Sequence, residues 1–169
     1  MGWLHLSGAT KKDVIKELQT HRNNQETDTV KYQQIASSVR GNVLWSVVER
    51  TDKATSTTRR FIACDLLRSG GDKFGWGYKD MDESVHPFYH SCPLSYLELA
   101  PEVDCEEWRV KVREYHARRN QKLSVGQRLK LVNSSIPYVD IRSVKPLQGY
   151  YNGLLYRVPK KFIGEIMSQ

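Results

Sequence analysis

Long apolar runs are missing from this sequence, since no stretch approaches the ~18 consecutive apolar residues that a membrane-spanning helix needs. The first residues, MGWLHLSGATKKD, hold no basic stretch followed by a long apolar core, so we expect no secretory signal. Cysteine is scarce: there are three, without CxxC spacing, which argues against a disulfide framework or a zinc finger. These absences predict a cytoplasmic protein with reduced thiols and no membrane partner.

Several motifs of ligand-binding proteins are also missing. The glycine-rich stretch RSGGDKFGWG (68–77) lacks the GK[ST] of a phosphate-binding loop, so we expect a turn there and no bound cofactor. The aromatic pair of an RRM, the loop of a KH domain and paired Cys/His finger ligands are not found either. The chain therefore belongs to none of these recognisable nucleotide or nucleic-acid modules.

Charge, by contrast, is abundant and unevenly distributed over the 169 residues, whose net charge is +7. Residues 1–104 hold 13 Lys and Arg against 14 Asp and Glu, whereas residues 105–169 hold 13 against 5. The last third of the chain thus has a net charge of +8 and the rest has −1. Such asymmetry predicts an anionic partner for the C-terminal part, either nucleic acid or an acidic protein complex.

The first part, residues 1–103, reads as an α+β lobe. Thr10 and Asp13 are spaced as a capping box, and the apolar residues that follow predict a helix at 10–20. β-branched and aromatic residues then predict an antiparallel meander, with the Gly41–Asn42 pair as a hairpin turn. The expected strands lie at about 29–39, 43–50 and 59–67.

The second part, residues 104–169, reads as a basic lobe. A helix is predicted at 105–120, and Cys105, Trp108, Val112 and Tyr115 share the one face of it that we expect to be buried. Short alternating segments and the Asn152–Gly153 turn signal then predict antiparallel strands, which would suit a small SH3-like or OB-like barrel. A continuation of the first sheet is the alternative. The last segment, KKFIGEIM, is read as a turn of helix.

Basic residues are concentrated in and after this helix. Helical geometry places Lys111, Arg118 and Lys122 on one side of the apolar stripe. Arg109 and Arg113 lie on its other side. Arg128 and Lys130 project from one side of the strand that follows. They could present one surface to phosphates, or they could be a solvated basic face whose stems lie on apolar surface. The candidate anion-binding residues are Arg109, Lys111, Arg113, Arg118, Arg119, Lys122, Arg128 and Lys130.

The stretch GWGYKDMDESVHPFYHSCP (75–93) concentrates acids, histidines and aromatics. His86, His90 and Cys92 could suggest zinc, but Pro87 disfavours a helix that contains both histidines, so we expect no metal site. Cys92, beside Pro93, could instead be a thiol nucleophile with a histidine as its base.

The acids of the same stretch offer a third chemistry, because Asp80, Asp82 and Glu83 could bind Mg²⁺ for phosphoryl transfer. The spacing of Asp80 and Glu83 is also that of a capped helix, which we favour. If the protein were an enzyme, its candidate catalytic residues would be Asp80, Glu83, His90 and Cys92. The interpretation that we favour is structural, with a buried and unreactive Cys92.

The pattern WGYKDMDES…P…CPLSYL, followed by the EEWR helix, resembles an uncharacterised family of short proteins of bacteriophages and plasmids. The resemblance implies an accessory protein of a mobile element inside a bacterial host cell, and it implies no activity. We therefore expect a non-enzymatic protein that binds nucleic acid, or a host complex that handles nucleic acid, such as a defence system. The alternatives are a small hydrolase or nuclease-like enzyme and a virion or structural accessory protein.

Overall fold

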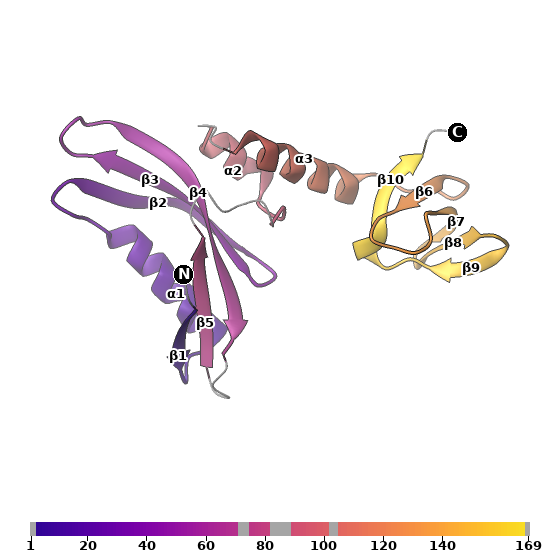
Figure 1. Ribbon diagram of the computed structural model, residues 1–169, viewed down its shortest axis with the longest axis horizontal. Helices are drawn as coiled ribbons and strands as arrows, with labels where there is room; N and C mark the ends of the chain where they lie inside the picture. The colour runs from indigo at the N-terminus through magenta and orange to yellow at the C-terminus, as the bar shows by residue number, and fades with distance from the viewer. Residues whose placement is uncertain (1–2, 71–74, 82–88, 102–104, 168–169) are drawn as a thin grey trace. The chain divides into compact units, whose positions relative to one another are not determined.

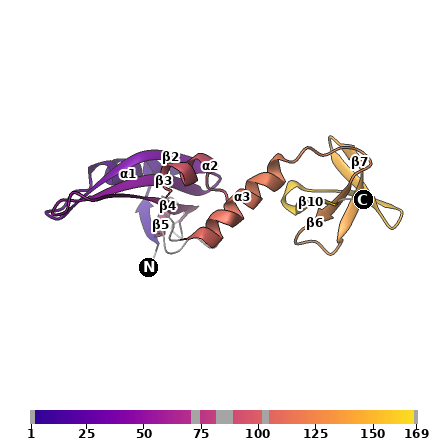
Figure 2. The same cartoon turned by 90° about the horizontal axis from the view of Figure 1, so that it is seen from above.

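The computed structural model describes residues 3–70, 75–81, 89–101 and 105–167, and it has an α+β fold with two antiparallel five-stranded sheets (Figures 1 and 2). The chain divides into two compact units, Met1–Arg113 and Glu114–Gln169. The division falls inside helix α3 (Glu106–Asn120), whereas the sequence placed the boundary at 103/104, before this helix.

The first unit is built on a sheet whose strands are ordered β1-β5-β4-β3-β2 and pair antiparallel throughout. The three predicted strands correspond to β2, β3 and β4, and the predicted Gly41–Asn42 turn joins β2 to β3. The strands are β1 (Leu4–Ser7), β2 (Val30–Arg40), β3 (Val43–Asp52), β4 (Thr58–Ser69) and β5 (Gly75–Met81).

Strands β1 and β5 are unexpected, because the glycines of GWG (75–77) favour a turn. Gly77 pairs with His5 of β1, and a Cβ at Gly77 would lie 2.5 Å from both the Leu4 carbonyl oxygen and the His5 Nδ1. Only glycine lets β1 approach this closely, so a residue that looks like a strand breaker is required inside the strand.

Helix α1 (Lys11–Asn24) covers one face of this sheet (Figure 1). The predicted capping box is confirmed, since the Asp13 N–H donates to Thr10 Oγ1 at 3.3 Å and the Thr10 N–H donates to Asp13 Oδ2 at 2.8 Å. The helix buries Val14 and Leu18 against Leu44 of β3 and Leu67 of β4.

A buried ion pair ties the last turn of α1 to the same face of the sheet. Arg22 Nη2 donates to both carboxylate oxygens of Asp65, at 2.8 and 2.9 Å, and Asp65 is fully buried. Removal of one partner would leave the other charge in a desolvated site, which strongly destabilises a fold.

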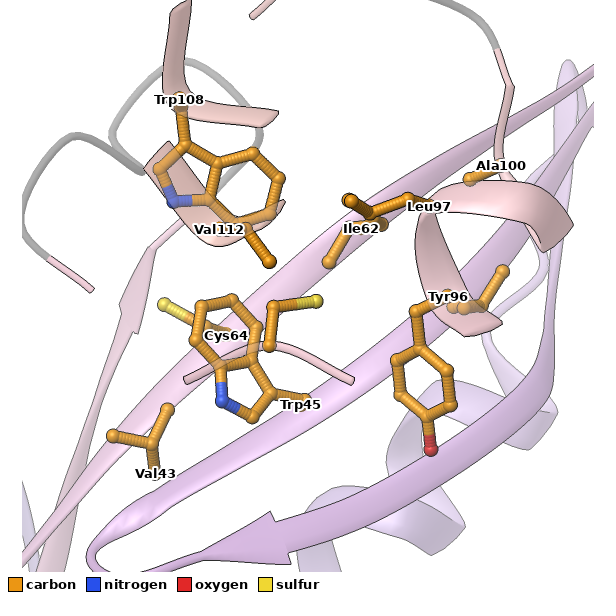
Figure 3. Close-up of a cluster of buried hydrophobic side chains, with 11 residues drawn as sticks. Val43, Trp45, Ile62, Cys64, Tyr96, Leu97, Ala100, Trp108 and Val112 are labelled. Atoms are coloured by element: carbon orange, nitrogen blue, oxygen red, sulfur yellow. The ribbon is translucent and has the colours of Figure 1, made fainter. Parts of the chain in front are cut away.

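The opposite face of the sheet is covered by α2 (Leu94–Leu99) and the first turns of α3. Figure 3 shows the two indole rings of this cluster, Trp45 from β3 and Trp108 from α3, whose centroids are 5.9 Å apart. Trp108 is only 4% exposed, and its Nε1 donates to the Tyr89 carbonyl at 2.6 Å. The predicted burial of Trp108 is therefore confirmed.

The second unit contains the other sheet, with strand order β10-β6-β7-β8-β9 and antiparallel pairing throughout. The predicted Asn152–Gly153 turn is confirmed, since it joins β8 to β9 with Tyr151 opposite Leu154. The strands are β6 (Arg128–Leu131), β7 (Tyr138–Val144), β8 (Leu147–Tyr151), β9 (Leu154–Arg157) and β10 (Ile163–Met167).

The end of the chain corrects the prediction for KKFIGEIM. Only Lys160–Phe162 is helical, as the 3-10 turn η2, and β10 follows at once and pairs with β6. Gly164 allows this pairing, because a Cβ there would lie 2.5 Å from the Lys130 carbonyl oxygen. The apolar Ile163 and the partly buried Ile166 thus complete a sheet rather than a helix face.

Candidate anion-binding surface

The eight predicted anion-binding residues fall into different environments, and Arg109 is the clearest correction. Its side chain is buried, with Nη1 donating to the Leu97 carbonyl at 3.0 Å and Nη2 donating to the Ala100 carbonyl. These carbonyls lie at the C-terminal end of α2, where the helix leaves acceptors without intrahelical donors. Burial lowers the pKa of Arg109, although a guanidinium stays charged in proteins. The prediction for Arg109 is wrong because α2 packs over this side of α3.

Lys111 and Arg113 also lie in the first unit and have acidic neighbours on their own helix. Lys111 Nζ is 2.5 Å from Glu107 Oε1, and Arg113 Nη1 is 3.0 Å from Glu106 Oε1. Such exposed pairs contribute little stability, but they partly neutralise the two cations. These residues are accessible and only weakly cationic as a group.

Arg128 in the second unit is held by its neighbours in the sheet. Its Nε and Nη2 donate to the two carboxylate oxygens of Asp140 at 2.7 and 2.9 Å, and its guanidinium lies 4.2 Å from the Tyr138 ring centroid. The hydrogen bond from Arg128 lowers the pKa of Asp140 and the same bond raises the pKa of Arg128. Arg128 is therefore a fixed group with a compensated charge.

The other four predicted residues lie in the second unit without an ion pair to any acid that the described residues contain. Lys122 and Lys130 are exposed. Arg118 and Arg119, in the last turn of α3, line a cavity of about 550 Å³ together with two lysines that the sequence analysis did not select. The full lining is Tyr115, Arg118, Arg119, Val132, Asn133, Lys160, Lys161 and Ile163.

Three elements of the second unit form this cavity, which we call the cationic cavity. The Val132 N–H donates to the Phe162 carbonyl at 2.9 Å, which holds η2 against the end of β6. Gln121 Nε2 donates to the Gly164 carbonyl at 2.5 Å, which ties the residues after α3 to β10. The walls of the cavity are the end of α3, the residues after β6, and η2 with the first residue of β10, and these hydrogen bonds join them.

Four cations surround the cationic cavity, and no acid is among its lining residues. Arg119 is partly ordered, since Nη1 donates to the Tyr115 hydroxyl at 2.7 Å and the guanidinium lies 5.3 Å from the ring centroid. Positive charges that gather in a concave site concentrate the potential and attract anions. Arginine and lysine donate hydrogen bonds to the oxygens of phosphate or carboxylate groups.

Lys160 and Lys161 were missed because their segment was read as a helix of the C-terminal lobe with no role. The Lys-Lys pair directly after Pro159 contributed to the +8 charge of residues 105–169, and this was the only signal for it. Their proximity to Arg118 and Arg119 depends on the pairing of β10 with β6, which the sequence analysis did not predict.

Of the four residues proposed for an enzyme, the structure describes the backbone position of Asp80 and the surroundings of His90 and Cys92. Asp80 lies in β5 opposite Asp65 of β4, so its predicted role as a helix cap is wrong. An N-cap is followed directly by a helical residue, whereas Met81, the residue after Asp80, is still in β5 and pairs with Cys64. Glu83 and His86 lie outside the described residues, and His90 is half-buried before α2.

Cys92 is completely buried in the cluster that contains Trp45 and Trp108. Burial raises the pKa of its thiol, so the nucleophilic thiolate is disfavoured, and Sγ donates weakly to the Pro93 carbonyl at 3.6 Å. The predicted burial of Cys92 is confirmed, and its slow reaction stays a prediction.

Comparisons with known proteins add no assignment, since no protein-family model, no curated protein and no solved structure matches this chain. Among the described helices, none has the length and apolar character that a membrane span requires. Within the same residues, no three His, Cys, Asp or Glu side chains come together as a metal site.

Proposed function

We propose that the protein binds nucleic acid through its second unit, with backbone phosphates in the cationic cavity. The observation that carries this proposal is the arrangement of Arg118, Arg119, Lys160 and Lys161 around one cavity without an acid in its lining. Phosphates repeat along a nucleic acid at short spacing, so one strand can neutralise several of these cations at once.

The formal charge of each unit supports the same proposal. Residues 114–169 contain ten Lys and Arg against three Asp and Glu, whereas residues 1–113 contain sixteen of each kind. The whole net charge of +7 therefore belongs to the second unit. A polyanion that meets this unit releases its condensed counterions, and this release drives binding in a salt-dependent way.

A matched pair of double variants tests the proposal. Arg118→Gln with Lys160→Gln removes two charges from the cationic cavity, while Lys111→Gln with Arg113→Gln removes two paired charges from the first unit. Affinity for labelled DNA is measured by fluorescence anisotropy between about 50 and 200 mM salt. We expect the cavity variant to bind weakly and to lower the slope of log K against log salt by about 2, or roughly 0.9 for each phosphate that is no longer neutralised. The control should keep the slope of the parent.

The same experiment can contradict the proposal. An absence of DNA and RNA binding at about 50 mM salt would exclude nucleic acid as the ligand of the cavity. An equal decrease in affinity in both double variants would indicate a diffuse effect of net charge instead of a site.

We also propose a finer architecture for the second unit, an SH3-like or OB-like small barrel, with the SH3-like form preferred. The support is its connectivity: four strands follow one another as a meander, then the 3-10 turn η2 precedes a fifth strand that pairs with the first of the four. Register shifts in β7–β8 and β10–β6 allow the strong bending that closure requires. This fold class alone does not select a ligand.

Finally, we propose that the protein is a non-enzymatic accessory protein of a phage or another mobile element in a bacterial cell. The sequence resemblance described above supports this context. The burial of Cys92, which raises the pKa of its thiol and disfavours a nucleophilic thiolate, supports the non-enzymatic role. Affinity purification from the host with nuclease-treated and untreated extracts tests it. Nucleic acid, or a host complex that handles it, should be recovered with the parent and should be absent with the cavity variant.

A further inference from the structure

An exposed tyrosine lies on the outer face of the sheet in the second unit. The side chain of Tyr150 is 42% exposed although the neighbouring Gly149 is buried and Tyr151 packs against the core. Across the sheet, Tyr150 lies opposite Leu155 of β9, which is 49% exposed. Single exposed apolar residues are ordinary, but cross-strand neighbours form a continuous apolar surface.

The same cross-strand row continues with charged residues on the other side of Tyr150. Asp140 lies opposite Tyr150, and Arg128 lies opposite Asp140. The bidentate pair of Arg128 and Asp140 neutralises the carboxylate, so the acid does not make this face repel phosphates. The row Arg128–Asp140–Tyr150–Leu155 thus spans four strands with no uncompensated negative charge.

Cations without an acidic partner among the described residues flank this row. Lys130 pairs in register with Tyr138, and Arg157 pairs with Gln148, two residues from Tyr150. Both cations are exposed. Side chains two residues apart in a strand share a face, so Lys130 and Arg157 lie on the same outer face as the tyrosine.

The alternation along β6 leads from this face to the cationic cavity. Leu129 and Leu131 are buried, so Arg128 and Lys130 occupy the outer side of β6. Val132, which directly follows β6, lines the cavity, so the cavity begins where the strand that carries Lys130 ends.

We propose that the outer face of this sheet binds single-stranded nucleic acid, with a base stacked on Tyr150 and the backbone running past Lys130 to the cationic cavity. This inference rests on the proposed function and names its substrate class. Every base has a flat π-face that can stack on an exposed tyrosine, whereas a duplex keeps these faces stacked inside and exposes phosphates, sugars and base edges. The combination of the cationic cavity with an exposed tyrosine therefore suits single strands better than duplexes.

The test compares a labelled single strand of about 16 nucleotides, as DNA and as RNA, with the matching duplex at one salt concentration. The variants are Tyr150→Ala, Tyr150→Phe, and Leu154→Ala as a control at an exposed residue on the same hairpin. We expect Tyr150→Ala to weaken single-strand binding roughly 5- to 150-fold, the loss of one stacked base, and to leave duplex and heparin binding unchanged. Tyr150→Phe and Leu154→Ala should bind like the parent, because stacking requires the ring and not the hydroxyl.

The outcomes separate this inference from the proposed function. Salt-dependent binding of duplex at least as tight as that of the single strand, or no loss of affinity in Tyr150→Ala, overturns the stacking inference and leaves phosphate binding in place. No binding of any nucleic acid overturns both. Circular dichroism of each variant shows whether it is folded, and a folded Tyr150→Phe that loses as much affinity as Tyr150→Ala also contradicts stacking. A difference between the DNA and RNA strands identifies which of the two is preferred.

Discussion

The two units of this chain use charge in opposite ways. In the first unit positive and negative side chains are equal in number, and several are internally paired, from the exposed Lys111–Glu107 pair to the buried Arg22–Asp65 pair. In the second unit cations outnumber acids by ten to three, and four of them surround one cavity. Charges are largely balanced and often paired in the first unit, whereas in the second the four cations of this cavity have no acid in its lining.

The apolar cores of the two units also differ, because the first unit buries more side chains than the second. The first unit buries residues on both faces of its sheet, and β3 is covered on both sides from Val43 to Val48. Among its described residues, 114–167, the second unit has one small buried cluster of five residues, and its outer face leaves Tyr150 and Leu155 exposed. A sheet with one solvated face can offer that face to a partner, and a sheet covered on both faces cannot.

The largest expected effect lies in the core of the first unit. Trp108→Ala should lower the free energy of unfolding by about 3–5 kcal/mol, because it removes a buried indole and its hydrogen bond to Tyr89. All four tryptophans lie in residues 1–113, so tryptophan fluorescence during urea unfolding reports on this unit. The control is Val110→Ala, at an exposed residue of the same helix, which should change stability by less than about 0.5 kcal/mol. A stable Trp108→Ala variant would show that the helix does not depend on this core.

A smaller effect on stability is expected for Arg109 of α3, which is buried, than for Trp108, and it distinguishes Arg109 from Arg118, which lines the cationic cavity. Arg109→Met should cost about 1–3 kcal/mol, because the carbonyls of Leu97 and Ala100 lose their donors, and DNA affinity should not change. Arg118→Met should do the reverse, with weak DNA binding and nearly unchanged stability. Urea unfolding and anisotropy on both variants provide the comparison. Loss of DNA affinity in a folded Arg109→Met variant would contradict the assignment of Arg109 to the fold.

The smallest effect concerns pH and the Arg128–Asp140 pair. The pKa of Asp140 is lower in the folded protein than its ordinary value, so its contribution to stability is complete above that ordinary value, about 3.9. The contribution is lost as the pH falls through the lower folded-state pKa. Asp140→Asn should therefore remove part of the acid sensitivity of the second unit, measured by far-ultraviolet circular dichroism between neutral and acid pH. An unchanged acid transition would show that the pair contributes nothing measurable to stability.

Local patterns were enough to predict a large part of the fold. The capping box at Thr10, the three long strands of the meander, the Asn152–Gly153 turn and the burial of Trp108 were all predicted from neighbouring residues. Each depends on spacing within one element or one hairpin, where backbone geometry fixes which side chains share a face. Strand β5 was missed because its glycines reflect the approach of β1, more than sixty residues away in the sequence.

Composition and local spacing were sufficient to locate the excess positive charge in the last third of the chain and to select Arg118 and Arg119. Which cations are available to a ligand depended on the folded arrangement. Packing of α2 turned Arg109 into a buried donor, and the pairing of β10 with β6 placed Lys160 and Lys161 beside the end of α3. Charge follows directly from composition, whereas burial and proximity arise from contacts between residues far apart in the chain, which no local pattern encodes.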